Sequence, residues 1–195
     1  MTAILKVDTI QDTAGNNIIN ESSDTITIGA AGDTVNVPGT AGTGFGKVLQ
    51  TVSVETGALI TASSNVFPED DTIPQSNEGT QVMSLAITPV NASSKLHIFV
   101  NAFGSHSAST RTGIALFVDS TANAISFSCS ANAGATTMMG ASLNHILTSA
   151  STNARTYKIR MAGMQSSGTL SFNGQGGARK FGGVASSSII IMEIA

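Results

Sequence analysis

The N-terminal part of the chain repeats a short alternating unit that cannot fold as a single copy. Residues 24–32 (DTITIGAAG) and 33–39 (DTVNVPG) share Asp and Thr at their first two positions and a β-branched apolar residue at the third and fifth. Residues 8–15 form a looser copy. Each unit predicts a strand of about five residues that ends in a glycine turn. Such short strands bury little apolar surface and become stable when copies stack or when chains wind round each other. The segment therefore predicts an oligomeric, fibrous protein.

Composition divides the 195-residue chain into three segments. Residues 1–38 contain the repeats, and residues 39–46 (GTAGTGFG) form a Gly-rich hinge without periodicity of their own. Residues 47–195 lack a helical stripe and instead alternate apolar and polar residues over about eight or nine strand-length stretches. We therefore expect an all-β protein, in which a short β-repeat attachment segment precedes an antiparallel jelly-roll sandwich that forms the head.

Two short polar segments of the head predict turns between neighbouring strands. Residues 91–94 (NASS) follow a predicted strand at 82–89, and residues 119–121 (DST) follow one at 113–118. Each turn is followed at once by another strand-like stretch, which is the pattern of a β-hairpin.

Charged residues make up only 11% of the chain, against about a quarter in typical soluble domains. A surface so poor in charge suits a chain whose faces are largely buried against partners. The net charge of −3 and the pI near 5.5 argue against nucleic-acid binding, which needs a basic face. No apolar run is long enough for membrane insertion and the first residues do not resemble a signal peptide, so we expect synthesis in a cytoplasm.

The last predicted strand is apolar on both of its faces. Alternation predicts that Ile190, Met192 and Ile194 face the core, which leaves Ile189 and Ile191 on the outer side. A strand of this kind is expected where the outer face meets another subunit. The alternative is a strand that a loop of the same chain covers.

Phe99 raises the same question, because it lies beside His97 on the side of residues 95–102 that is opposite to their apolar stripe. Together with the fibrous N-terminus, this pattern favours a subunit interface. In a threefold assembly, copies of His97 could ring the axis around an ion or anion, but an ordinary half-buried histidine is the better explanation of the residue. The candidate interface residues are Phe99, His97, Ile189 and Ile191.

A Gly-rich segment at residues 174–183 carries Arg179 and Lys180, the only adjacent basic pair in the chain. It predicts a flexible loop that presents two cations to an anionic surface glycan, and the alternative is a solvated hairpin end. The loop at residues 105–111, which ends in Arg111, is a further candidate. The candidate receptor-facing residues are Arg179, Lys180 and Arg111.

No motif in the chain predicts catalysis or nucleotide binding. Residues 39–47 depart from a phosphate-binding loop, because Ala41 takes a required glycine position and Val48 follows the lysine where Ser or Thr is needed. The chain also lacks a Gly-x-Ser-x-Gly elbow and has no Trp on which a sugar substrate would stack. We therefore expect that the protein is not an enzyme.

The residues that bind metals are few and scattered along the sequence. His97, His106 and His145 have no ligand partner at metal-binding spacing, and a single cysteine, Cys129, excludes an internal disulfide. We expect no metal and no cofactor.

Both ends of the chain resemble one class of proteins. Residues 5–16 (LKVDTIQDTAGN) resemble the start of many fibre and appendage proteins of marine bacteriophages, including those that infect cyanobacteria. Residues 176–183 (GGARKFGG), which run into residues 188–194 (SIIIMEI), are similar to the closing segment of such proteins. The resemblance implies a short homotrimeric appendage with a C-terminal jelly roll of the kind seen in phage fibre heads and tumour-necrosis-factor-like trimers. It implies no catalytic residues.

The resemblance and the composition leave three functions open. The first is a tail fibre or receptor-binding appendage of the virion, which attaches to the host through several weak sites. The second is a capsid decoration, cement or head-fibre protein that stabilises the shell. The third, an enzyme that acts on surface polysaccharide, is the least favoured. The expected partners are further copies of the chain, other virion proteins at the N-terminal segment and, for the first function, a host surface glycan.

Overall fold

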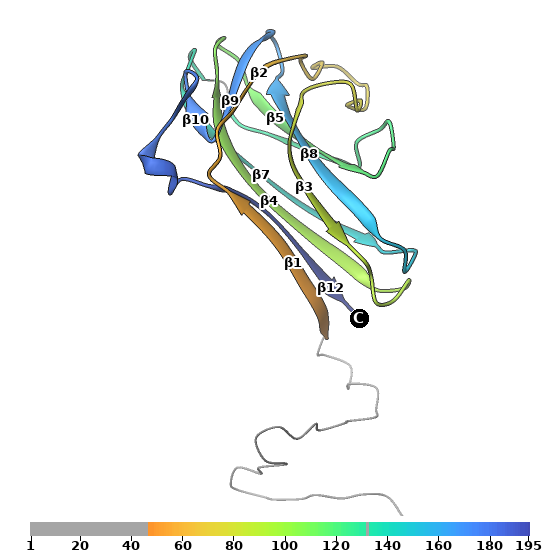
Figure 1. Cartoon of the computed structure of the whole chain (residues 1–195). Coiled ribbons are helices and arrows are strands. Elements are labelled where there is room, and N and C mark those ends of the chain that lie inside the picture. The colour runs from red at the N-terminus through yellow and green to blue at the C-terminus, as the bar shows by residue number, and fades with distance from the viewer. Residues whose placement is uncertain (1–46, 132) are drawn as a thin grey trace, which may run out of the picture. The chain divides into compact units, whose positions relative to one another are not determined.

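Two antiparallel β-sheets lie face to face in the computed structural model, which describes residues 47–131 and 133–195 (Figure 1). The segments predicted at residues 1–38 and 39–46 lie outside the described residues. The larger sheet has six strands: β1 (Val48–Thr56), β2 (Ile60–Ser64), β4 (Lys95–His106), β7 (Met138–Thr148), β9 (Gly168–Phe172) and β12 (Ser187–Ile194). The smaller sheet has four: β3 (Thr80–Ile87), β5 (Thr112–Val118), β6 (Ser126–Cys129) and β8 (Arg155–Gly163).

A small hairpin and one helical turn complete the described part of the chain. Strands β10 (Gly174–Gln175) and β11 (Ala178–Arg179) pair with each other, and a turn of 3-10 helix, η1 (Phe181–Gly183), follows them. The structure confirms the predicted all-β, antiparallel jelly-roll sandwich.

The long strand β4 organises the larger sheet. One edge of β4 pairs with β7 from Lys95 to Ser105. The other edge pairs first with β12 and then, at Gly104–His106, with β9. Strand β1 extends the sheet beyond β12, and β2 extends it beyond β9. The smaller sheet has the order β3-β8-β5-β6.

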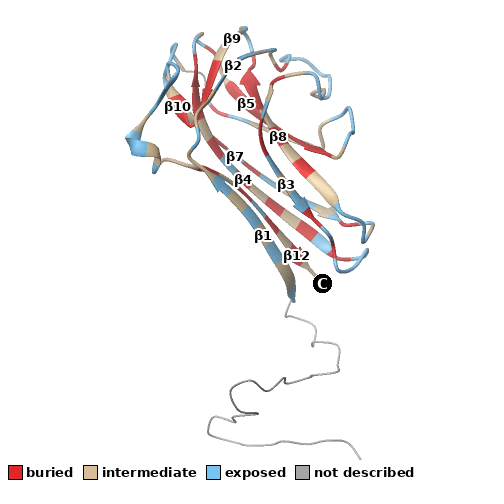
Figure 2. Cartoon of the chain, viewed as in Figure 1, coloured by how far each residue is buried: buried red, intermediate tan, exposed pale blue. Residues whose placement is uncertain are grey.

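The core between the sheets is formed by the alternating apolar residues that the sequence places on single strand faces. Leu96, Ile98 and Val100 of β4 belong to the same buried cluster as Ile159 and Met161 of β8. Figure 2 shows these buried stripes along both sheets. Burial of this many aliphatic side chains provides the main driving force for folding.

The predicted orientation of the last strand is wrong. Ile189 and Ile191 are completely buried in the core, whereas Ile190 points outwards and is 36% exposed. The register explains the reversal: Ile190 lies opposite Phe99 on β4, and Phe99 is on the outer side of the sheet. Ile189 and Ile191 are therefore core residues of one chain and do not contribute to an outer surface.

The predicted hairpin at residues 91–94 is also wrong. The strands on either side of it, β3 and β4, belong to different sheets, so this turn carries the chain across the sandwich. By contrast, the predicted hairpin around residues 119–121 is confirmed, because β5 and β6 pair antiparallel.

Buried Glu193 explains how the turn between the two sheets is held. Its carboxylate accepts hydrogen bonds from Gln50 Nε2 (2.6 Å), the backbone N–H groups of Val90 (2.9 Å) and Asn91 (3.0 Å), and Ser94 Oγ (2.5 Å). Burial by itself would raise the pKa of Glu193, but these hydrogen bonds to the charged form outweigh it and lower the pKa to about 2. The carboxylate thus joins β12 to β1 and to the crossover turn.

We expect Glu193→Gln to reduce the free energy of unfolding at pH 7 by about 2–3 kcal/mol, because the charged acceptor of four hydrogen bonds is lost. The folded pKa lies below the unfolded value, so this stabilisation is complete above pH 4.5 and disappears as the pH falls towards 2. Urea denaturation at pH 7 and at pH 3 measures both effects. Exposed Asp71→Asn, the control, changes stability by less than about 0.5 kcal/mol. An equal loss in Glu193→Gln at both pH values would contradict the role of the charge.

Candidate functional site

The outer face of the larger sheet carries an apolar patch centred on Phe99. On β12, Ile190 lies opposite Phe99 and Met192 lies opposite His97. On β7, Ile146 lies opposite His97. Ile146 is 53% exposed and Ile190 is 36% exposed. We call these five residues the outer-face patch: Phe99, His97, Ile146, Ile190 and Met192.

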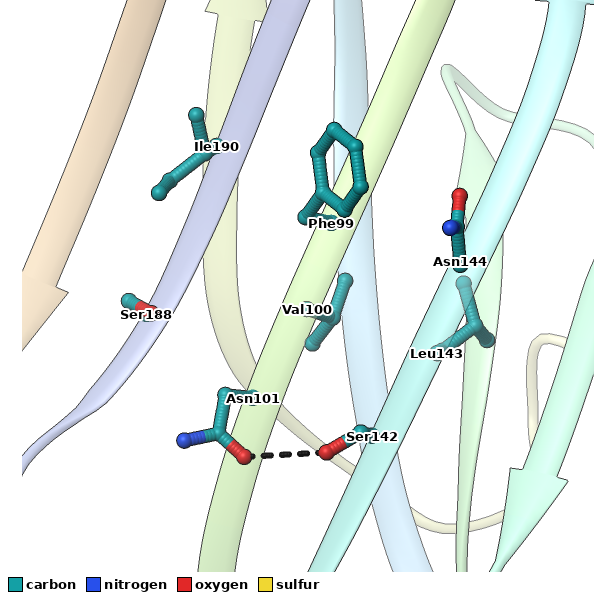
Figure 3. A pocket seen from close by; sticks show the side chains of 8 residues that line it. All are labelled: Phe99, Val100, Asn101, Ser142, Leu143, Asn144, Ser188 and Ile190. Carbon is teal, nitrogen blue, oxygen red and sulfur yellow. Dashed lines mark hydrogen bonds between the residues drawn. The ribbon is translucent and has the colours of Figure 1, made fainter.

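Most residues around the outer-face patch are small and uncharged, and charged side chains on the same face, Lys95 and Glu55, lie only at its two ends. Phe99 and Ile190 border a shallow hollow of about 330 Å³ that opens on this face (Figure 3). At its rim, Ser142 Oγ donates a hydrogen bond to Asn101 Oδ1 (3.1 Å). Polar, uncharged side chains lie beside the patch on the outer face of β1, β4, β7 and β12. They are Thr51, Ser53, Ser188, Asn101, Ser142 and Asn144.

The outer face of the smaller sheet is different, because the chain covers its apolar part. Phe67, from the connection between β2 and β3, is completely buried in a second cluster with Ala115, Phe117 and Ala162. Its ring packs edge-on against Phe127 at 5.5 Å. Within residues 47–195 no comparable segment lies over the outer-face patch, so covering by a loop explains one apolar sheet face and not the other.

The structure keeps Phe99 and His97 together as the sequence suggests, with their ring centroids 6.1 Å apart. It separates them from Ile189 and Ile191, which lie on the opposite side of the sheet. Their places on the outer face are taken by Ile190 and Met192, which the sequence pattern assigned to the core.

The predicted receptor-facing loop runs from β11 into η1, in the dark-blue segment that stands away from both sheets in Figure 1. Arg179 is exposed and Lys180 is half-buried. The loop also carries two apolar side chains that sequence reasoning missed, Phe181 (68% exposed) and Val184 (86% exposed). The sequence did contain a signal for these residues: two large apolar side chains within a Gly-rich stretch, outside any strand pattern, indicate apolar residues on a loop.

This loop is braced rather than loose. A Cβ atom on Gly57 would come within 2.3 Å of the carbonyl oxygen of Gly183, so the backbone of the loop packs closely on the connection between β1 and β2. Phe181 adopts a positive φ of 50°, a conformation that costs a non-glycine residue free energy. The fold therefore holds an exposed aromatic ring beside two cations in a fixed turn.

Arg111 is not part of the same charged surface. It lies immediately before β5, and its guanidinium forms an ion pair with Glu69. The charge of Arg111 is therefore already matched within the chain, whereas Arg179 and Lys180 form no ion pair with a described residue.

Of the other two histidines, His145 lies on β7 opposite Ile98, and His106 ends β4. Burial lowers the pKa of His106 and of His145, so both are held towards the neutral form. The part of the chain that the structure describes contains no group of three or more His, Cys, Asp or Glu side chains placed to hold a metal ion. It also contains no helix that is long and apolar enough to cross a membrane.

No protein-family model matches the chain, and no curated protein sequence does. Among solved structures, Eiger TNF from S. frugiperda is similar over 74% of this chain and 93% of its own, with 10% identity and a TM-score of 0.43. The VP2 subviral particle of infectious bursal disease virus is similar over 84% of this chain, with 16% identity and a TM-score of 0.33. This chain spans 43% of that VP2 chain. At these values the likenesses identify neither a family nor a function.

We expect that Phe181→Gly does not destabilise the protein. The side chain makes little packing contact, and glycine adopts positive φ without strain, which offsets the greater flexibility of the unfolded chain. The free energy of unfolding should stay within about 1 kcal/mol of the wild type in urea denaturation. Phe172→Ala in the core is the matched control, with an expected loss of about 3–5 kcal/mol. A loss in Phe181→Gly that approaches the control would show that Phe181 has a packing role.

Proposed function

We propose that the protein is a virion structural protein, a tail fibre or receptor-binding appendage of a bacteriophage, and that it acts as a homotrimer. The observation that carries this proposal is the outer-face patch. It is an apolar, uncharged area at the centre of a sheet, and residues 47–195 do not cover it. The resemblance of both chain ends to phage appendage proteins supports the assignment to a virion.

The partner that we propose for the outer-face patch is a second and third copy of the same chain. Thr, Ser, Asn and apolar side chains pack against their own kind without leaving a charge unpaired, whereas a charged partner would lose hydration there. A closed ring of identical chains buries such a patch on every subunit. Residues 1–38, whose repeats need several chains to become stable, favour the same assembly and would attach it to other virion proteins.

The proposed host contact is the loop around η1. Arg179 and Lys180 supply positive charge, and Phe181 supplies a ring that can stack on the apolar face of a sugar. A host surface glycan with anionic groups fits this combination. Three copies of the loop on one trimer, multiplied by several trimers on a virion, would turn a weak contact into firm attachment. In this function the protein binds and does not catalyse.

A capsid decoration, cement or head-fibre role is the alternative. The outer-face patch serves that role equally well, because shell-stabilising proteins also assemble through covered surfaces. The exposed, braced loop favours host contact, since a protein that only reinforces a shell has no need to hold an aromatic ring in solvent.

Self-association is tested with Ile190→Asp in the full chain. A carboxylate at the centre of the outer-face patch would have to be buried in every subunit, so we expect the trimer to dissociate at a protein concentration at least tenfold higher than for the wild type. Sedimentation equilibrium over a range of concentrations measures this. Ser84→Asp is the control, because Ser84 is an exposed strand residue of the smaller sheet. A monomeric wild type, or equal behaviour of both variants, would contradict the proposed interface.

The host-binding role is tested on intact virions. Cryo-electron microscopy should place the protein on the tail or its collar, and virions with Arg179→Ala and Lys180→Ala should adsorb to host cells at least tenfold more slowly, because the exposed cations of the loop are lost. Lys95→Ala, which removes an exposed cation from the larger sheet, is the matched control. Density at symmetry points of the capsid, with normal adsorption and shells that break at lower temperature when the protein is absent, would instead establish the decoration role.

A further inference from the structure

A second pocket opens on the outer side of the larger sheet, further along β4 from the outer-face patch. It has a volume of about 290 Å³, near the lower end of small-molecule sites. Strands β4 and β9 form its floor, and the turn of the β10–β11 hairpin forms one wall. We call it the hydroxyl pocket, and it is lined by Ser105, Ser107, Thr169, Ser171, Gly176 and Gly177.

Three backbone N–H groups hold the serine hydroxyls of this pocket in place. Ser105 Oγ accepts from Gly176 N (3.3 Å), and Ser171 Oγ accepts from Gly177 N (2.9 Å). The third hydroxyl, Ser107 Oγ, accepts from Thr169 N (2.8 Å). Because each oxygen already accepts a hydrogen bond, each hydroxyl has its hydrogen left to donate.

Two of these three hydroxyls, those of Ser105 and Ser171, belong to side chains that solvent hardly reaches. Ser105 is 1% exposed and Ser171 is 2% exposed, yet neither hydroxyl donates to any residue that the structure describes. A buried hydroxyl without an acceptor is costly, so the pocket favours a molecule that brings acceptor oxygens. The two glycines have positive φ values of 58° and 79°, and the space in front of them is open, which leaves the mouth accessible.

The chemistry of the lining selects among ligand classes. No charged side chain and no imidazole lines the hydroxyl pocket, which disfavours a metal ion. A small anion is disfavoured as well, because the N–H groups of Gly176 and Gly177 that would form an anion nest already donate to serines. A purely apolar ligand would leave the hydroxyl hydrogens unsatisfied. A neutral polyol, whose hydroxyl oxygens accept and whose hydrogens donate, meets each requirement.

We propose that the hydroxyl pocket binds one neutral sugar unit. The chemical class of the ligand is inferred from the pocket alone. Its source, a host surface glycan, rests on the proposed function. The site is distinct from the loop around η1: the cations there would engage anionic groups, whereas the hydroxyl pocket would hold an uncharged unit of the same or a neighbouring chain. Two adjoining contacts of this kind raise affinity more than either alone.

The test uses the full chain, with methyl glucoside, methyl galactoside and N-acetylglucosamine as probes and inorganic sulfate as the anionic comparison. Binding is followed by changes in NMR chemical shifts. Ser105→Ala with Ser171→Ala removes the two buried hydroxyls that carry the argument, and we expect it to weaken binding at least tenfold. Thr156→Val, a half-buried threonine on β8, is the matched control and should bind as the wild type does.

Saturable binding of a sugar that the double variant loses and Thr156→Val retains would support the site. Absence of binding to every sugar, equal binding in the double variant, or preference for sulfate would overturn it. Thermal melting checks that both variants fold. The virion experiments separate the two proposals: loss of adsorption in the Arg179–Lys180 variant with no sugar binding leaves the proposed function standing and removes the pocket. If the protein binds sugar but lies on the capsid and its variant virions adsorb normally, the pocket stands and the proposed host-attachment function is removed.

Discussion

The antiparallel register between β4 and β12 decides which side of the larger sheet becomes core and which becomes surface. Ile190 lies opposite Phe99, so both are outward, and Ile189 and Ile191 are driven inward with the apolar stripe of β4. A shift of one residue would exchange the two faces of β12 completely. The outer-face patch depends on this register, because it lies across β4, β7 and β12. The hydroxyl pocket depends instead on the pairing of β4 with β9, whose outward residues line it.

Glu193 explains why that register is stable although β12 is apolar on both sides. In the alternative register this carboxylate would point to solvent and an isoleucine would take its place inside. In the observed register it is buried, and its four hydrogen bonds reach β1 and the turn that crosses between the sheets. A buried carboxylate is tolerated only with such compensation, and here two of the four donors are backbone N–H groups that themselves need an acceptor. The polar contact thus selects between two hydrophobic arrangements of similar quality.

These contacts show what the sequence could predict. The strands with one apolar and one polar face, such as the first half of β4, followed directly from alternation. The facing of β12 did not, because the decision lies with Gln50, Val90 and Ser94, distant in sequence from Glu193. Strand β7 is hard to predict from the sequence, since its outward positions Gly140 and Asn144 carry little strand propensity and its conformation comes from pairing with β4. In the candidate site, the cations and the Phe99–His97 pair were foreseeable, but the hydroxyl pocket combines three segments that only the fold brings together.

The distribution of charge over the described surface separates assembly from recognition. The outer-face patch itself contains no Asp, Glu, Lys or Arg side chain, and the charged residues of the same face, Lys95 on β4 and Glu55 on β1, lie at its two ends. Burial of the patch therefore costs little hydration of charged groups. The adjacent basic pair sits instead on the braced loop around η1, on a part of the chain that stands away from both sheets. Recognition loops need a rigid base. The proposed host contact therefore depends on the proposed assembly, because the sheet that joins the subunits also holds the loops that would meet the host.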